Sequence, residues 1–499
     1  MFLYLFFFLA LYAVSTHIIH KIRNLPPTPF PALPVIGHLH LLEKPLHRSL
    51  SEISKRHGPI LLLQLGSRYV LHVSSPSIAE ECLTKNDIMF ANRPYLLVGK
   101  HFGYNHTSLL WTPYGDHWRN LRRVVTVELL STRSLRLLSS IRGDEVRMLV
   151  LGLLKNRGQI VDMRSAFFEL MLNVIMRMIA GKRYYSDSVE EVEEARTFHE
   201  MVRETFHLVD ATTMADFLPV LNWFQNYEKR MIALQEKRDI IMQELIEESR
   251  NKMSNDGGSL AVGKKKTVIE VLLSLQKKEP ENYKDEIIRS IMMVLLNAGT
   301  ETSSGTMEWA MSLLLNNPEV LKKAQMEIDN VVGHDRMMDE SDLAKLPYLH
   351  CIICETMRMY PVTPLLLPHE SSKECMVGGH RVPRRTTLLV NMWAIQNDPN
   401  IWEEPTKFKP ERFGGFEGPR VGFKLLPFGS GRRSCPGEGL AISMVGLTLG
   451  SLIQCFEWER TSEEMVDMTQ GSGLTMPKER ALHAKCRPRQ AMMNMLSRS

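Results

Sequence analysis

The sequence predicts a mainly helical fold with a small β region, preceded by an apolar segment at the N-terminus. Helical patterning of apolar residues dominates from about residue 74 to about residue 360. Between Leu50 and Val73, short strand-like runs such as PILLLQLGSRYVLHV alternate with polar turns, which is typical of a small sheet. The run from Phe2 to Ile19 is almost uninterrupted apolar sequence. Together these features indicate a short N-terminal unit followed by a large helical body.

Composition limits the functions that the chain can have. It has 499 residues, 44% hydrophobic and 23% charged, so it can bury a sizeable core and enclose a cofactor. A formal net charge of +5 is too small and too dispersed for a nucleic-acid partner, but it hints at a membrane surface or an acidic protein partner. The 7 cysteines are too scattered for a disulfide framework, which favours a reducing compartment.

The N-terminal apolar run is just long enough to span a bilayer as a helix. No charged residue precedes it apart from the amino terminus, and it is followed by His20, Lys21 and Arg23. This asymmetry predicts a membrane anchor over residues 1–24, with the rest of the chain in the cytosol.

A cleaved signal peptide is the alternative, since Ala13-Val14-Ser15 resembles a cleavage site. The lack of a preceding basic region and of a disulfide pattern favours the anchor.

A proline-rich segment follows the apolar run. It contains 5 prolines before Gly37, which predicts a stiff, extended hinge over residues 25–45. Residues 46–499 then form the main domain.

Two stretches of the main domain are predicted to lack regular structure. Residues 252–266 have the composition of a solvated loop, and residues 361–434 are rich in proline and glycine and are predicted to be irregular. An irregular stretch of that length is often functional.

The stretch PFGSGRRSCPGEG surrounds Cys435 with glycine and positive charge. Gly429, Gly431 and Gly437 let backbone N–H groups approach an anionic atom closely. Pro436 suits the first position of a helix, which would place Cys435 at a helix N-terminus. There the helix dipole lowers the pKa of a thiol. Most lone cysteines are small buried hydrophobic residues, but this loop indicates a bound thiolate.

A thiolate in such a loop can act as a nucleophile or as a metal ligand. A cysteine nucleophile needs a partner base, and none is recognisable in the sequence. A ligand to haem iron needs only N–H donors to the sulfur and a flat apolar neighbour. Phe428 offers the apolar cover, and Arg433 offers a cation for a haem propionate. The loop therefore favours Cys435 as a haem iron ligand.

The same loop resembles the haem loop of the cytochromes P450, the haem-thiolate monooxygenases. FGSGRRSCPG matches the family pattern F-x-x-G-x-R-x-C-x-G at all of its fixed positions, Phe428, Gly431, Arg433, Cys435 and Gly437. The resemblance covers the whole chain and is greatest to plant proteins of the endoplasmic reticulum, in the group of isoflavone 2'-hydroxylases and sesamin-type methylenedioxy-bridge synthases. It implies the cytochrome P450 fold, haem b as cofactor and O2 as co-substrate.

A long helix is predicted from Asp285 to Asn316, and its middle, NAGTETSSGT, is rich in poor helix formers. On the sequence alone, these small residues could serve a close helix crossing. The stretch resembles the family motif A-G-x-[DE]-T, which implies that Ala298 and Gly299 open a groove for dioxygen. The resemblance further implies that Thr302 hydrogen-bonds the iron-bound oxygen and that Glu301 helps to deliver protons.

A predicted ion pair lies in the motif ETMR. Glu355 and Arg358 are one helical turn apart, within salt-bridge reach. Most such pairs are surface pairs that contribute little to stability. The resemblance instead joins both residues to Arg412 of FKPERF, in a buried triad that braces the haem loop. This triad is structural and has no direct part in catalysis.

Other basic residues are assigned to the haem or to a protein partner. Trp118 and Arg122 of WRNLRR share a helix face, and the resemblance places them at a haem propionate, with His369 on the opposite side. Three more basic residues could face an acidic reductase or could form an ordinary solvated surface: Arg123, Lys424 and Arg432.

The resemblance implies insertion of one oxygen atom from O2 into a lipophilic substrate. Electrons would come from NADPH through a separate reductase, because the sequence has no flavin or dinucleotide fingerprint. One alternative is a haem protein that does not oxygenate, such as a sensor or sterol-binding carrier. Another is a haem-thiolate isomerase or dehydratase that acts on a hydroperoxide. Retention of Thr302 and Glu301 favours the monooxygenase.

The substrate is predicted only as a class. The resemblance implies a plant specialised metabolite, either a phenylpropanoid derivative such as an isoflavonoid or lignan, or a terpenoid. The reaction would be hydroxylation or methylenedioxy-bridge formation, on the cytosolic face of the endoplasmic reticulum membrane. By family position, apolar residues would line the pocket, namely Phe102, Phe206, Leu295, Ala298, Val362, Leu366 and Met476.

Overall fold

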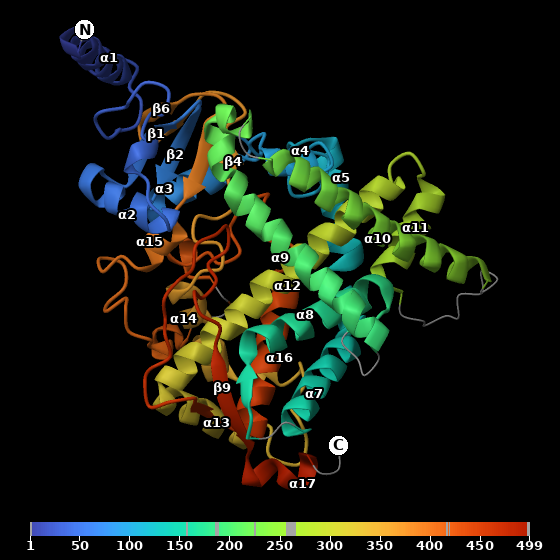
Figure 1. Cartoon of the computed structure of the whole chain (residues 1–499). Helices are drawn as coiled ribbons and strands as arrows, with labels where there is room; N and C mark the ends of the chain where they lie inside the picture. Colours follow the sequence, from blue (N-terminus) through green and yellow to red (C-terminus); the bar gives the residue numbers. More distant parts are fainter. Residues whose placement is uncertain are drawn as a thin grey trace.

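The computed structural model describes residues 2–155, 158–184, 189–223, 226–255, 266–415, 418 and 420–496 (Figure 1). The helices of the first half are α1 (Phe2–Ile22), α2 (Leu46–His57), α3 (Pro76–Glu80), α4 (Leu97–His101), α5 (Asp116–Arg123), α6 (Thr132–Leu137), α7 (Ser139–Lys155), α8 (Met163–Ala180), α9 (Val189–Phe217) and α10 (Tyr227–Asn255). The later helices are α11 (Val268–Lys278), α12 (Asp285–Asn316), α13 (Pro318–Val331), α14 (Pro347–Met359), α15 (Met392–Gln396), α16 (Glu438–Cys455) and α17 (Met493–Leu496). The strands are β1 (Ile60–Leu65), β2 (Arg68–Val73), β3 (Ile160–Asp162), β4 (His369–Glu370), β5 (Cys375–Val377), β6 (His380–Val382), β7 (Thr387–Val390), β8 (Phe456–Arg460) and β9 (His483–Pro488).

Helix α12 runs through the middle of the body (Figure 1). Its 32 residues extend about 48 Å at about 1.5 Å per residue. Helix α8 packs against it most extensively, and α14 and α16 also pack against it. The stretch from Met307 to Leu315 is buried throughout. The observed bounds, Asp285–Asn316, confirm the predicted helix.

The largest sheet has its strands in the order β1-β2-β7-β4. Strands β1 and β2 form an antiparallel hairpin whose turn contains Gly66 at φ +56°, a conformation that favours glycine. Strand β7 pairs in parallel with β2, with Val73 opposite Val390, and β4 pairs antiparallel with β7. Two smaller sheets have the orders β3-β9-β8 and β5-β6. The mainly helical fold with a small β region is thus confirmed.

Two local predictions are wrong. Residues 50–57 belong to helix α2, because Leu46, Leu50 and Ile53 recur at helical spacing and pack in one cluster with residues of β1. Residues 361–434 are not irregular throughout, since they contain β4 to β7 and α15. These strands have only 2 to 4 residues, which is too short for an alternating pattern. Of the loop predicted at 252–266, α10 includes the start, and residues 256–265 lie outside the described residues.

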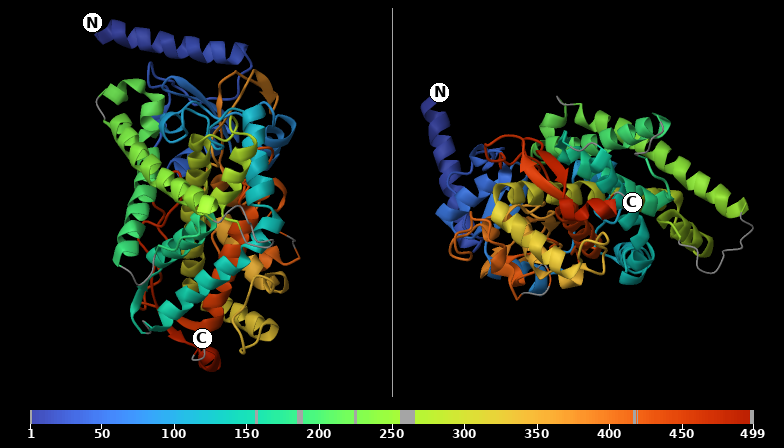
Figure 2. Two further views of the ribbon diagram at one scale, coloured as in Figure 1. Left: turned by 90° about the vertical axis from the view of Figure 1, so that its right-hand side faces the viewer. Right: turned by 90° about the horizontal axis from the view of Figure 1, so that it is seen from below.

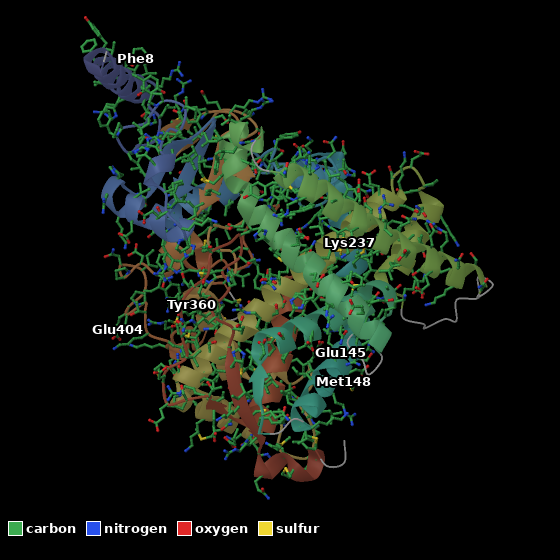
Figure 3. All side chains as sticks on the ribbon, in the orientation of Figure 1. Phe8, Glu145, Met148, Lys237, Tyr360 and Glu404 are labelled. Atoms are coloured by element: carbon green, nitrogen blue, oxygen red, sulfur yellow. The ribbon has the colours of Figure 1, made fainter. Side chains whose placement is uncertain are left out.

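Helix α1 projects from the body on the side of the largest sheet, and the second set of views shows the same separation (Figure 2). Several of its apolar side chains are exposed, including Tyr4, Phe7 and Phe8, and Figure 3 labels Phe8 on this projecting helix. Among the described residues, one helix is long and apolar enough to cross a membrane by composition, namely α16. That helix is largely buried inside the body.

The proline-rich segment between α1 and α2 lies against strand β1. The Leu62 N–H donates to Pro27 O at 2.9 Å. The His38 N–H donates to Gln64 O at 2.7 Å, and the Gln64 N–H donates to His38 Nδ1 at 2.9 Å. Gly37 has φ +60°, and a Cβ there would collide with the Gln64 carbonyl. Glycine therefore allows this segment to lie close to the sheet.

Candidate functional site

The loop before α16 is a tight hairpin that depends on glycine. The Cys435 N–H donates to Phe428 O at 2.8 Å and closes the hairpin. Gly429 and Gly431 have φ values of +67° and +71°, the left-handed region that glycine tolerates best. A Cβ on Gly431 would also lie 2.5 Å from Asp87 Oδ1. The loop thus needs glycine at both positions.

The sulfur of Cys435 accepts a backbone hydrogen bond and is open to solvent. Helix α16 begins at Glu438 with Gly437 as its N-cap, so Pro436 precedes the helix and is not its first residue as predicted. The Gly437 N–H donates to Cys435 Sγ at 3.3 Å, because no helical carbonyl is available to it at the helix start. Of the 7 cysteines, Cys435 alone is exposed.

The protein around Cys435 raises the pKa of the thiol above its ordinary value. The prediction that the helix N-terminus lowers this pKa is therefore wrong for the protein without iron. Desolvation by the surrounding protein has the largest effect, and it outweighs the Gly437 N–H and the positive charge of Arg122, which both lower the pKa. Cys435 is exposed as a residue, yet enough protein atoms surround its thiol for desolvation to dominate. A bound iron cation would supply the charge that a thiolate needs here.

The middle of α12 has one open face. Ala298 is exposed, although Leu296 and Thr300 on either side of it are fully buried. The Thr302 hydroxyl donates to Ala298 O at 2.6 Å, a local bond that satisfies the hydroxyl proton within the helix. The open face therefore combines a small apolar residue with a hydroxyl group whose present acceptor is a backbone carbonyl.

Gly299 lies where helix α12 packs against helix α8. A Cβ on Gly299 would lie 2.7 Å from Ile175 Cδ1 of α8, so the absence of a side chain is used by the neighbouring helix. Helix α12 is continuous through this position. Gly299 therefore permits the close crossing of α8 and α12, which is the alternative that the small residues of this stretch allowed; the dioxygen groove stays a prediction.

Glu301 lies next to the open face and binds protons more tightly than an ordinary glutamate. Burial raises the pKa of its carboxyl group, Arg164 opposes this effect, and the like charge of Glu308 adds to it. No ion pair joins Glu301 to a cation within the described part of the chain. A carboxyl group whose pKa is raised toward the working pH is suited to hold and pass on protons.

A group of cations lies close to the cysteine loop. The Arg433 guanidinium donates to Ala91 O at 2.7 Å and Leu109 O at 3.2 Å, and it lies 4.6 Å above the Trp118 ring. Arg122 donates to Ser434 O at 2.7 Å. These contacts place the predicted pair Trp118 and Arg122 in one site with Arg433, which the sequence predicted separately.

Sequence reasoning missed a further member of this site, Arg93, which stands in the stretch ANRP before the predicted pocket. It is 4% exposed and donates to Pro368 O at 2.6 Å, and its Nε has no partner. His369, which follows Pro368 in the chain, is 7% exposed, and its ring Nδ1 lies 2.8 Å from Phe90 O. Burial lowers the pKa of His369 well below its ordinary value, and Arg93 and Arg433 add to the effect. A basic residue within an otherwise apolar stretch was the available signal for Arg93.

The donors and charges of this site fit a dianionic ligand. Arg93, Arg122 and Arg433 have no carboxylate partner among the residues that the structure describes. The pKa of Arg433 is lowered to about 8, mainly by burial and also by the positive charges of Arg93 and Arg122. Buried cations that repel one another are costly unless an anion joins them. The two propionates of haem would meet this need, and the exposed Cys435 would meet its iron.

The structure also brings Glu355, Arg358 and Arg412 together. Arg358 donates to both carboxylate oxygens of Glu355, at 2.7 and 2.9 Å, and both side chains are 0% exposed. Arg412 Nε donates to Glu355 Oε1 at 3.1 Å, and the Lys409 N–H donates to the same oxygen at 3.0 Å. Arg358 also donates to the carbonyl of Gln396 at 2.8 Å. The carboxylate is thus saturated by donors of the chain itself.

The remaining predicted residues are more dispersed. Arg432 pairs with Asp87, whereas Arg123 and Lys424 are exposed. Of the predicted pocket residues, Phe206, Leu295 and Val362 are half-buried, and three others are buried: Phe102, Leu366 and Met476. Leu366 belongs to the core beside the largest sheet. These residues therefore contribute to packing as well as to any pocket.

Comparisons with known proteins agree with this site. The family model described as Cytochrome P450 matches residues 26–484. Cytochrome P450 81Q32 of Catharanthus roseus is 52% identical, over 99% of this chain and 98% of that protein. A (+)-piperitol/(+)-sesamin synthase of Sesamum radiatum is 47% identical over 95% and 92%. An isoflavone 2'-hydroxylase of Medicago truncatula is 45% identical over 94% and 93%.

A solved structure gives the same result for the fold. A zebrafish cytochrome P450 with progesterone superposes with a TM-score of 0.78 at 28% identity, over 89% of this chain and 100% of that one. The resemblance found in the sequence, to the cytochromes P450 and to their isoflavone 2'-hydroxylase and sesamin synthase group, is therefore confirmed. The chain belongs to the cytochrome P450 family and is a haem-dependent monooxygenase.

Proposed function

We propose that the protein inserts one oxygen atom from O2 into a lipophilic plant metabolite of the isoflavonoid or lignan type, with electrons supplied by NADPH through a separate reductase. The observation that carries this proposal is that the exposed Cys435 lies close to Arg93, Arg122 and Arg433, which have no carboxylate partner among the described residues. The substrate class rests on the names of the relatives, which include isoflavone hydroxylases and a sesamin synthase. A terpenoid is the remaining alternative.

The residues of the chain divide the work of holding haem. Cys435 would bind the iron, and Phe428 would cover the sulfur. Arg93, Arg122, Arg433 and His369 would hold the propionates, with Trp118 beneath the Arg433 guanidinium. Haem bound in this way supplies the activation of O2. The triad of Glu355, Arg358 and Arg412 would brace the fold without touching the reacting atoms.

Two residues of α12 would handle protons. The Thr302 hydroxyl, which now donates to Ala298 O, would turn its proton toward the open face and hold a water there. Glu301 would replenish that proton, since its raised pKa keeps a larger fraction of the carboxyl protonated. Ala298 leaves room beside them because its side chain is small and exposed.

Reconstitution with NADPH-cytochrome P450 reductase tests the proposal. With an isoflavone or a lignan as substrate, we expect NADPH-dependent product that has gained one oxygen atom, or has lost two hydrogen atoms if a methylenedioxy bridge forms. An isomerase or dehydratase would need a hydroperoxide and no NADPH, and a sensor or carrier would yield no product. In Thr302→Ala, product per NADPH should fall at least several-fold while peroxide rises, because positioned acid–base groups contribute roughly 10²–10⁴-fold.

A membrane location is part of the same proposal. Residues 1–24 would anchor the protein in the endoplasmic reticulum membrane, residues 25–45 would act as a hinge, and residues 46–499 would form the catalytic domain facing the cytosol. The exposed apolar side chains of α1 and the basic residues after it support this arrangement. Deletion of residues 2–23 should release the protein from microsomes and leave haem binding intact; loss of haem would contradict a separable anchor.

The reductase would dock on the exposed cations Arg123 and Lys424. Arg432 is a weaker candidate, because its guanidinium is already paired with Asp87. Charge-reversal at the two exposed positions should slow electron entry more at low salt than at high salt.

A further inference from the structure

Arg238 of helix α10 is a buried cation with unused hydrogen-bond donors. Its side chain is 2% exposed, and its Nε and Nη1 atoms have no hydrogen-bond partner. The guanidinium lies over the Phe102 ring, 4.6 Å from the ring centroid. This contact uses the face of the cation and leaves its N–H groups free. Unpaired buried donors are rare in native proteins, and each such case indicates a strained group, a water or a ligand.

The acid next to Arg238 in the chain, Asp239, already accepts hydrogen bonds from other donors. Asp239 Oδ1 accepts from the Tyr104 hydroxyl at 2.5 Å and from Gln235 Nε2 at 3.0 Å. Arg289 of α12 forms an ion pair with the same oxygen at 3.2 Å, although the geometry at its Nε is not that of a hydrogen bond. Arg238 therefore has no ion pair within the part of the chain that the structure describes. Burial lowers its pKa to about 10, so it keeps its positive charge at neutral pH.

The elements packed against α10 carry two residues of the predicted substrate pocket. Helix α10 packs against both α4 and α12. Phe102, which follows α4, and Leu295 of α12 belong to the predicted substrate pocket. On α12, Asn297 Oδ1 is also buried without a partner and directly precedes the exposed Ala298. Buried polar atoms without a partner thus occur on both α10 and α12, and we call the surface formed by Arg238, Phe102 and Leu295 the Arg238 wall.

A purely structural role does not explain these observations. A structural arginine would be joined to a carboxylate or to carbonyl oxygens, as Arg358 is. The aromatic contact with Phe102 would be equally available to a guanidinium whose donors were satisfied. The free donors instead suit an oxygen acceptor that enters the pocket from outside the chain, and an aromatic ligand could meet Phe102 at the same time.

We propose that Arg238 is a specificity-determining residue, which donates hydrogen bonds to an oxygen acceptor conjugated to an aromatic ring of the substrate, such as a ring carbonyl or phenolic oxygen. The inference rests on the proposed function and deepens it, because it names the polar group by which the substrate is recognised. The oxygen would be fixed at the Arg238 wall, and the carbon to be oxidised would lie at the opposite end of the ligand, toward Ala298 and Thr302.

Equilibrium binding to the full-length holoprotein tests the inference. The probes are two matched pairs, an isoflavone with the corresponding isoflav-2-ene and a chalcone with the corresponding 1,3-diarylpropene, in each of which the second member has CH2 in place of the carbonyl group. Binding is followed by the change in haem absorption. Wild type should bind the carbonyl member of at least one pair roughly 10-fold more tightly or better, as expected for a hydrogen bond from a charged donor. In Arg238→Met the preference should fall below about 3-fold. Equal binding of both members by wild type, or an unchanged preference in Arg238→Met, would overturn the inference.

A stability measurement separates recognition from packing. Arg238→Met removes an unpaired buried charge, so its unfolding temperature should equal or exceed that of wild type. Arg289→Met is the matched control, since it removes a cation that pairs with Asp239. It should lower the unfolding temperature and leave the carbonyl preference unchanged. If Arg238→Met is destabilised as much as Arg289→Met, Arg238 is structural and the inference fails. Binding requires neither NADPH nor O2, so loss of turnover with intact carbonyl preference would count against the proposed function alone.

Discussion

Two groups of buried and half-buried arginine side chains differ in how their charge is balanced. Arg358 and Arg412 both donate to Glu355, a carboxylate supplied by the chain. Arg93, Arg122 and Arg433 instead donate mainly to backbone carbonyls. Since a buried charge without a counter-ion is costly, the first group is complete in itself and the second is completed by a ligand. This difference shows that the hydrogen-bond partners of an arginine, more than its burial, distinguish a structural arginine from one that binds a ligand.

The strongest test of this comparison removes the carboxylate of the first group. Glu355→Gln would leave the buried Arg358 and the half-buried Arg412 without a counter-charge, and we expect a loss of about 3–5 kcal/mol in the free energy of unfolding. Chemical denaturation of the purified protein measures this loss. Glu374→Gln is a matched control, because Glu374 pairs with Arg381 on the surface at 2.7 Å, with both side chains more than half exposed. Its effect should stay below about 1 kcal/mol. Equal effects of the two substitutions would show that the buried triad has no special role.

The second group should respond in its ligand affinity. In Arg122→Met we expect haem to be released roughly 10- to 100-fold faster, because a charge-assisted hydrogen bond to a propionate is lost. Transfer of haem to an excess of apomyoglobin measures the rate. Arg119→Met, on the same helix but 52% exposed and paired with Asp116, should release haem at the wild-type rate. Haem retention unchanged by Arg122→Met would contradict the assignment of this group to the propionates.

The sequence predicted the features that depend on local pattern. The bounds of α12 were predictable because apolar residues recur at helical spacing on both sides of NAGTETSSGT, and no proline occurs between Lys284 and Pro318. The glycine positions of the cysteine loop were predictable because left-handed backbone favours that residue. Glu355 and Arg358 pair across one helical turn, which their spacing indicates.

Features that depend on distant neighbours could not be predicted. Gly299 faces Ile175, which is more than a hundred residues away in the chain, and only the packed structure shows that contact. The raised pKa of the Cys435 thiol results from dense surrounding protein, which a local helix-dipole argument does not include. Arg93 and Arg238 have no special spacing in the sequence, and their importance follows from the carboxylates that they lack.

Glu301 is the acidic counterpart of the unpaired arginines and should show the smallest effect. Burial raises the pKa of its carboxyl group above the ordinary value of 4.5. The protonated form is therefore favoured by folding, and this contribution to stability is complete below the ordinary value and is lost as the pH rises through the raised pKa. The stability of Glu301→Gln minus that of wild type should therefore be larger at about pH 8 than at about pH 4. Thermal unfolding at both pH values checks this, and a gain confined to acid would contradict it.

The reduced carbon-monoxide spectrum tests the central claim, that Cys435 is the thiolate ligand of a haem held by the unpaired cations. Cys435→Ser keeps a side-chain acceptor for the Gly437 N–H but removes the sulfur. Cys375→Ser, at a half-buried cysteine of strand β5, is the matched control. We expect the red-shifted carbon-monoxide absorption of the reduced protein to be present in wild type and in Cys375→Ser, and to be absent in Cys435→Ser. Retention of that absorption in Cys435→Ser would contradict the claim.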